Sequence, residues 1–311
     1  MNVRLPAPSS DANDRGFVIV PVLWILLMLA TLTGILSVYL ANSAVALALN
    51  DDRLRSTALV SAGIEITAYK LLSSAKATRP LSGAFVFPMD HSRVSVRFSS
   101  EASRIDLNLA SKDLLANLFQ VLGSQPKDAM AFADRIVGWR ASPPEDALDS
   151  ENSLYRIGGA RYLPRGAPFP NVQELWLVLG LPPVLVERAM QFITVYSGRP
   201  EVNVFEAAPE VVASLPGMTP AALDRFLQQR QNLRRDMKAV AEVLGPELTG
   251  VSVQGSDAVR VRTEIEFENG RRSAAEVVIL LEAGDDPYRV LSWRDDAEIA
   301  GFRRSRIARS P

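Results

Sequence analysis

The sequence predicts an α+β protein with a long N-terminal transmembrane helix, a domain with an antiparallel sheet, and a large all-α domain inserted into it. Three observations support this prediction. An uncharged, largely apolar run extends from Gly16 to Asn50. Strand patterns occur before residue 108 and again after residue 249, and the stretch between them has the periodicity of helices. A chain of 311 residues is long enough for two folded units besides the apolar helix.

The apolar run is longer than a membrane span requires, since about 20 residues cross the hydrocarbon core as a helix. From Leu54 to Leu72 an apolar stripe of helical period follows the run, and Pro80 ends the pattern. One helix from Val22 to Leu72 would be about 75 Å long. Two helices that break near Asn50 are the alternative.

The polar leader, residues 1–16, ends in Gly16, and the apolar run begins at once with Phe17. This arrangement resembles the type IV prepilin signal, in which a membrane peptidase cleaves after the glycine. The resemblance implies cleavage between Gly16 and Phe17; an uncleaved single-pass anchor is the alternative. The fifth residue of the processed chain would be Pro21 instead of the usual glutamate. The absence of this glutamate suits a subunit with no subunit ahead of it. In such a subunit the carboxylate would be buried without a partner, which is costly.

Strand candidates flank the helical stretch on both sides, and Asn269-Gly270 predicts a tight hairpin turn between two of them. We therefore divide the chain into the leader, a transmembrane segment at residues 17–50, and a sheet-bearing domain at residues 51–108 and 249–294. A charged tail, residues 295–311, follows. The candidate strands are residues 84–87, 94–98, 104–107, 259–262, 264–268, 276–281 and 288–293.

Residues 109–248 form the expected all-α insertion. Gly180-Leu-Pro-Pro183 and Gly217-Met-Thr-Pro220 each place a glycine at the end of one helix and a proline at the start of the next. Such corners resemble helix-hairpin-helix and SAM-like modules. Residues 105–118 and 202–215 match position by position in character, which indicates an internal repeat. The expected helices are residues 111–122, 127–140, 172–179, 183–195, 209–215, 219–231 and 236–244.

The composition excludes several kinds of site. The chain has no cysteine and a single histidine, His91, in a predicted turn. Disulfides, thiolate metal sites, cysteine nucleophiles and multi-histidine metal sites are therefore ruled out. The net charge of −1 gives no basic excess for a nucleic-acid partner. No Ser/His/Asp set, phosphate-binding loop or dinucleotide-binding glycine motif is recognisable, so we expect no enzyme.

The loop after Trp139 is acidic. Asp146, Asp149, Glu151 and Asn152 offer oxygen atoms of the kind that bind Ca²⁺, although their spacing matches no EF-hand. A solvated acidic loop without a metal is the alternative. These four residues are the candidate calcium site of the sequence.

Taken together, these features resemble the K-type minor pseudopilins of the type II secretion system. The resemblance covers nearly the whole stretch from Arg15 to Trp293 and rests on the order and spacing of its motifs. Those motifs are Arg15-Gly16-Phe17 followed by Trp24, Ala167-Pro-Phe169 before Val172-Gln-Glu-Leu175, Val202-Asn-Val204, Ala208 to Gly217, and Tyr288 to Trp293.

The resemblance implies a pilin-like α/β domain and a place at the periplasmic tip of a pseudopilus, beside the I-type and J-type minor pseudopilins. It implies processing by prepilin peptidase with N-methylation at Phe17, and a single-pass anchor in the bacterial inner membrane with the bulk of the chain in the periplasm. The family also binds calcium through an acidic loop after an Asp-Trp-x-Asp segment. Here Gly138 and Ala141 stand at the two aspartate positions, so this part of the family pattern is missing.

The expected function is that of a tip subunit that starts pseudopilus assembly with the other minor pseudopilins, for protein export across the outer membrane. No nucleic-acid partner is expected. The alternative is a membrane-anchored helix-hairpin-helix DNA-binding protein of competence type, which would bind DNA with micromolar or tighter affinity that weakens steeply with salt. A single-pass periplasmic hydrolase is a third class, supported only by carboxylates of no special arrangement.

Overall fold

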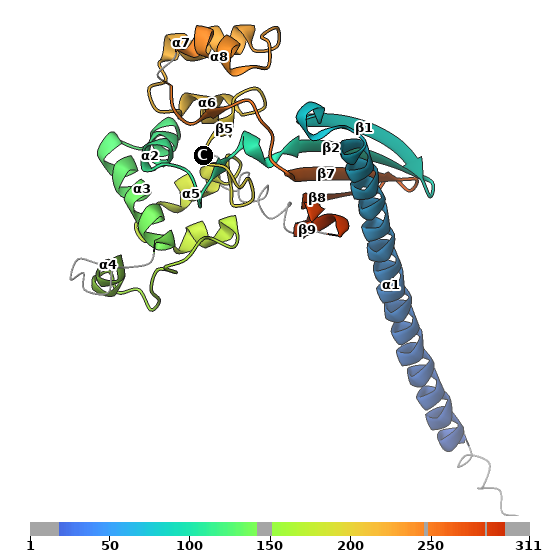
Figure 1. Ribbon diagram of the computed structural model, residues 1–311. Coiled ribbons are helices and arrows are strands. Elements are labelled where there is room, and N and C mark those ends of the chain that lie inside the picture. The colour runs from blue at the N-terminus through green and yellow to red at the C-terminus, as the bar shows by residue number, and fades with distance from the viewer. Residues whose placement is uncertain (1–18, 142–150, 246–247, 284, 296–311) are drawn as a thin grey trace, which may run out of the picture. The chain divides into compact units, whose positions relative to one another are not determined.

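The computed structural model describes residues 19–141, 151–245, 248–283 and 285–295 (Figure 1). The chain divides into two compact units, Met1–Ala58 and Leu59–Pro311. The first unit contains most of the long N-terminal helix, and the second contains the sheet and the inserted helices.

Helix α1, Ile19–Leu72, is a single helix of 54 residues, about 80 Å long at 1.5 Å per residue. The alternative of two helices that break near Asn50 is therefore wrong. Within α1 the stretch Ile19–Leu40 is long and apolar enough to cross a membrane, and none of its side chains is buried. Among the helices that the structure describes, it is the only stretch of this kind.

The second unit contains a five-stranded antiparallel sheet with the strand order β1-β2-β7-β8-β9 (Figure 1). The two strands before the insertion meet the three strands after it where β2 pairs with β7, with Ser92 opposite Phe267 and Ser100 opposite Val259. The predicted antiparallel sheet, interrupted by a helical insertion, is confirmed. Its strands are β1 (Ser82–Met89), β2 (Ser92–Ser100), β7 (Ala258–Phe267), β8 (Arg272–Ala283) and β9 (Asp286–Asp295).

The last turns of α1 pack on this sheet. Leu59, Ile64 and Leu71 are buried in a core that they share with strand side chains such as Val96. Burying a side chain of this size contributes roughly 1.5–3 kcal/mol. A Cβ atom at Gly63 would lie 3.0 Å from Val96 Cγ2, so the missing side chain lets helix and sheet approach closely.

His91 lies in the turn between β1 and β2. Asp90 and His91 have φ of 50° and 52°, the left-handed conformation that a two-residue hairpin turn requires at both positions. The His91 side chain is exposed. The prediction of a solvated turn residue is confirmed.

Between β2 and β7 the chain forms the helical insertion, whose buried side chains make a core of their own. Gly180 and Gly217 have φ of 81° and 85°, and Pro183 and Pro220 begin the helices that follow, so both predicted corners are confirmed. The domain boundaries at residues 109 and 248 stay a prediction. The helices are α2 (Lys112–Val121), α3 (Pro126–Arg140), α4 (Glu151–Ile157), α5 (Pro183–Ala189), α6 (Pro209–Ala213), α7 (Pro220–Gln229) and α8 (Met237–Leu244), with 3₁₀ helices η1 (Lys76–Thr78), η2 (Glu101–Ser103) and η3 (Val172–Leu177).

Three details of the predicted secondary structure are wrong. The helix expected at residues 183–195 ends at Ala189, because the chain then turns into a short strand, β4 (Ile193–Thr194). This strand pairs in parallel with β3 (Ile105–Asp106), so the strand expected at residues 104–107 does not belong to the main sheet. The segment expected as an α-helix from Val172 is the 3₁₀ helix η3.

The internal repeat is visible in the backbone. Asp106 and Asn203 occupy matching positions, and each accepts a hydrogen bond from the backbone N–H two residues on, at 2.9 Å from Asn108 and at 3.0 Å from Phe205. Each of the two residues also ends a two-residue parallel strand. The sequence similarity therefore reflects one local motif used twice. The strand pairs are β3 with β4, and β5 (Val202–Asn203) with β6 (Val251–Ser252).

Candidate functional site

The predicted processing site, Gly16 and Phe17, lies outside the described residues. Pro21 is the third residue of α1, in the first turn, where the missing backbone N–H leaves no helical hydrogen bond unmade. The structure thus explains why a proline is tolerated at this position. The cleavage and methylation stay predictions.

The stretch Ile19–Leu40 is a bare apolar surface. Trp24, Met28 and Ile35 expose 69%, 72% and 68% of their surface. The hydroxyl of Thr33 donates to the carbonyl of Leu29 at 2.7 Å, so this polar side chain is satisfied within the helix. A helix of this kind is suited to lipid or to the apolar faces of other helices, since all its backbone groups pair internally.

The candidate calcium residues are only partly described. Asp146 and Asp149 lie outside the described residues, and Glu151 and Asn152 form the start of α4, a helix that the acidic-loop interpretation missed. Glu151 Oε2 pairs with the Arg135 guanidinium at 2.7 Å. Its other oxygen, Oε1, is buried and accepts no hydrogen bond.

The described residues contain no group of three or more acidic, histidine or cysteine side chains that could hold a metal ion. Glu151 Oε1 is one oxygen of the kind that calcium requires, and further ligands would have to come from the segment around Asp146 and Asp149. The calcium site therefore stays a prediction.

An aromatic cluster lies next to Glu151. The ring of Trp139 stacks on Phe169 at 6.1 Å and contacts Tyr155 at 5.8 Å and Tyr162 at 6.3 Å. The hydroxyl of Tyr155 accepts a hydrogen bond from a backbone N–H at 2.8 Å. Burial raises the pKa of Tyr155 to about 12. These rings hold α3, α4 and the segment before η3 together.

A buried ionic junction links the insertion to the sheet, and the sequence analysis missed it. Glu101 in η2 is fully buried and accepts two hydrogen bonds from Arg260 of β7, at 2.7 and 2.9 Å. The hydroxyl of Thr194, on β4 of the insertion, donates to the same carboxylate. On the other side, Arg260 pairs with Glu276 of β8, and Glu276 pairs with Arg294 of β9. Five elements, from both the insertion and the sheet domain, therefore meet at these side chains.

The charges of the junction shift the pKa values of its members. Burial is the largest single effect and would raise the pKa of Glu101 and of Glu276, but the charge and hydrogen bonds of Arg260, together with the charge of Arg104, outweigh it at both. The pKa of Glu101 is lowered, and the pKa of Glu276 falls to about 2, with Arg294 adding to the effect. Burial and the charge of Arg260 lower the pKa of Arg104 to about 10. Both carboxylates are therefore ionised at neutral pH.

We expect this junction to make the protein sensitive to acid. The pKa of both carboxylates is lower in the folded chain than the ordinary value of 4.5, so their contribution to stability is complete above about pH 5 and is lost as the pH falls towards 2. The thermal midpoint of the full chain in detergent, followed from neutral pH downwards, should fall over this window. Glu276→Gln should flatten the fall, whereas Glu264→Gln, at an exposed carboxylate of the same sheet, should leave it unchanged. Equal slopes in the three proteins would contradict the prediction.

The architecture defines the class of the protein. A long helix whose C-terminal turns pack on an antiparallel sheet, and whose N-terminal stretch is apolar and exposed, is the arrangement of a pilin-type subunit. Residues 99–198, which make up much of the insertion, match the family model described as type II secretion system (T2SS), protein K. No curated relative matches the chain.

The fold is similar to that of a chain in the crystal structure of the GspK-GspI-GspJ complex from the type 2 secretion system of enterotoxigenic Escherichia coli. The TM-score is 0.53 at 17% sequence identity, and the match covers 78% of this chain and 94% of that chain. At this identity the structural likeness shows the fold alone. Together with the family match, it confirms the resemblance to K-type minor pseudopilins and supports a minor pseudopilin role.

Proposed function

We propose that the protein is the tip subunit of a type II secretion pseudopilus. In this role it starts pseudopilus assembly with the I-type and J-type minor pseudopilins, and so serves protein export across the outer membrane. The observation that carries the proposal is an insertion with its own hydrophobic core, placed between strands β2 and β7 of a pilin-type sheet. A subunit that carries such an additional domain is hard to repeat along a tightly stacked helical fibre. At the end of the fibre it meets no neighbour above it.

We also propose a localisation for the chain, at the inner membrane and in the periplasm. The stretch Ile19–Leu40 would anchor it in the inner membrane before assembly and pack against partner helices afterwards, with residues beyond the span in the periplasm. Its role would be structural, with no catalysis. A DNA-binding role rests only on the two glycine–proline corners, and Pro182 and Pro183 remove two backbone N–H donors from one of them.

The test of the proposed function is the N-terminus of the chain in membranes with and without prepilin peptidase. We expect the intact mass and terminal sequence to give a chain that begins at methylated Phe17 when the peptidase is present, and a chain that begins near Met1 when it is absent. Co-purification with I-type and J-type subunits from the same membranes is the second measurement. A chain that begins near Met1 in both membranes would refute processing and would favour the DNA-binding alternative.

We also propose calcium as a ligand of the acidic segment, through Asp146, Asp149, Glu151 and Asn152. The buried Glu151 Oε1 without a hydrogen-bond donor supports the proposal. Added Ca²⁺ should raise the thermal midpoint relative to a chelator, because a ligand that binds only the folded chain stabilises it. Glu151→Gln should reduce this rise and Glu210→Gln, at an exposed site, should not. An equal midpoint with Ca²⁺ and with chelator would refute the proposal.

A further inference from the structure

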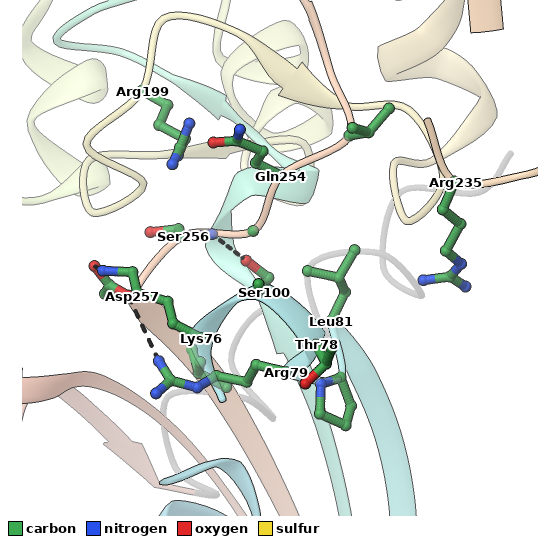
Figure 2. A pocket seen from close by; sticks show the side chains of 15 residues that line it. Lys76, Thr78, Arg79, Leu81, Ser100, Arg199, Arg235, Gln254, Ser256 and Asp257 are labelled. Carbon is green, nitrogen blue, oxygen red and sulfur yellow. Dashed lines mark hydrogen bonds and ion pairs between the residues drawn. The ribbon is translucent and has the colours of Figure 1, made fainter. Parts of the chain in front are cut away.

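A cavity of about 690 Å³ opens where the chain leaves the sheet for the insertion and returns to it (Figure 2). Its wall is formed by the loop after α1, residues 76–81, by the returning segment, residues 253–257, and by side chains of the insertion. The volume lies within the range of roughly 300–1,000 Å³ that is usual for ligand sites. The described residues that line this cavity do not include the predicted processing site, and the family match assigns no role to the cavity.

Cations dominate the wall of this cavity. Lys76, Arg79, Arg199 and Arg235 line it, and Asp257 is the only carboxylate among the lining residues. Asp257 lies 2.7 Å from Lys76, and Arg79 pairs with Glu282 outside the lining at 2.5 Å, so these two charges are largely compensated. The other two cations of the lining are arginines of the insertion, Arg199 and Arg235.

These two arginines differ in their partners. Arg235 lies over the ring of Phe205 and pairs with Glu206 at 3.1 Å through Nη1; its side chain is 59% exposed, so other N–H donors of its guanidinium stay open to a second carboxylate. In the part of the chain that the structure describes, no carboxylate pairs with the guanidinium of Arg199. A half-buried guanidinium that borders a cavity without a counter-charge is a site for a carboxylate from outside, because arginine binds carboxylates through paired N–H donors.

Figure 2 shows how the two arginines are placed. Arg199 and Gln254 lie on one side of the cavity, Arg235 lies on the other side, and the side chain of Leu81 lies between them in this view. A single small anion would meet only one of the two arginines. An extended peptide segment with acidic side chains could meet both, with its backbone or an apolar side chain over Leu81.

We propose that this cavity binds an extended acidic segment of a partner protein, with carboxylates at Arg199 and at Arg235. That the partner is another subunit of the pseudopilus rests on the proposed function; the ligand class rests on the cavity alone. Because Arg199 and Arg235 belong to the insertion and the other walls belong to the sheet domain, a bound segment would tie the two domains together.

The test uses the full chain in detergent and a fluorescent hexaglutamate peptide at low salt. Arg199→Gln combined with Arg235→Gln should weaken binding by about tenfold or more, since charge-assisted hydrogen bonds of this kind are lost. The matched control combines Arg161→Gln with Arg225→Gln, two exposed arginines outside the lining, and should change the affinity by less than about twofold. Circular dichroism and the thermal midpoint confirm that both variants are folded.

The outcomes separate this inference from the proposed function. Equal hexaglutamate affinity in the wild type and the cavity variant would overturn the inference, whatever the partners of the chain. Displacement of the peptide by inorganic phosphate, at an equal total concentration of negative charge, would also overturn the inference, because the site would then be one for a small anion. Failure of the wild type to co-purify with I-type and J-type subunits would count against the proposed function, and hexaglutamate binding would still decide the ligand class of the cavity.

Discussion

Replacing Glu101 with glutamine is expected to lower the free energy of unfolding by about 3–5 kcal/mol. The carboxylate is fully buried, and its partner Arg260 is buried as well. The substitution therefore removes one charge of a buried ion pair, and water cannot reach Arg260 to take the place of the lost carboxylate. Arg260 keeps Glu276 as a second partner, which places the expected loss within this range and not above it. Urea denaturation of the full chain in detergent, followed by circular dichroism, measures the difference.

The matched control for this prediction is Glu264→Gln. Glu264 lies on β7 with Arg260, but its side chain is 44% exposed, and it pairs with Arg97 at 3.6 Å. Exposed ion pairs contribute at most about 1 kcal/mol, so the control should change stability little. Similar losses at Glu101 and Glu264 would mean that the buried junction does not hold the two domains together.

The parts of the fold that the sequence predicted depend on local chemistry. The apolar run predicts α1, alternation predicts the long strands, and the glycine–proline corners predict where α5 and α7 begin. These signals are contained within a few neighbouring residues. The start of α5 follows from such local residues, whereas its end at Ala189, six residues before the expected end, does not.

The parts that the sequence did not predict depend on distant partners. Glu101 and Arg260 are 159 residues apart in the chain, and nothing in the pattern around either one indicates the other. Strand β3 lies within the strand expected at residues 104–107, but its partner β4 is too short for an alternating pattern, and the apolar residues Phe192 and Ile193 fit a helix equally well. Their pairing is decided by backbone hydrogen bonds across the insertion, which no local pattern reveals.

The candidate sites show the same division. The predicted processing motif at Gly16 and Phe17 is local, whereas the cavity is lined by residues from five separate stretches of the chain and could not be predicted from any one of them. Glu151 was identified from its acidic neighbours. Its ion pair with Arg135 and its unpaired buried oxygen depend on the packing of α3 against α4.

Replacing Trp139 with alanine is expected to lower the free energy of unfolding by about 3–5 kcal/mol, because it leaves a large cavity in the core of the insertion. Trp139 is only 3% exposed, and its ring contacts Tyr155, Tyr162 and Phe169. Its indole N–H donates to Glu174 at 3.3 Å, so the substitution also removes a polar contact. Denaturation in urea, with the same probe as for Glu101, measures the loss.

Trp176→Ala is the matched control, since this tryptophan is 43% exposed. It should cost less than about 1 kcal/mol, as surface substitutions usually do. The comparison also tests whether the aromatic cluster positions Glu151. If it does, Trp139→Ala should abolish any rise of the thermal midpoint with Ca²⁺, and Trp176→Ala should leave that rise intact. A Trp139→Ala protein that keeps the stability of the wild type would contradict the packing described for the insertion, since no other residue of the cluster could fill the space of the indole without moving α3 or α4.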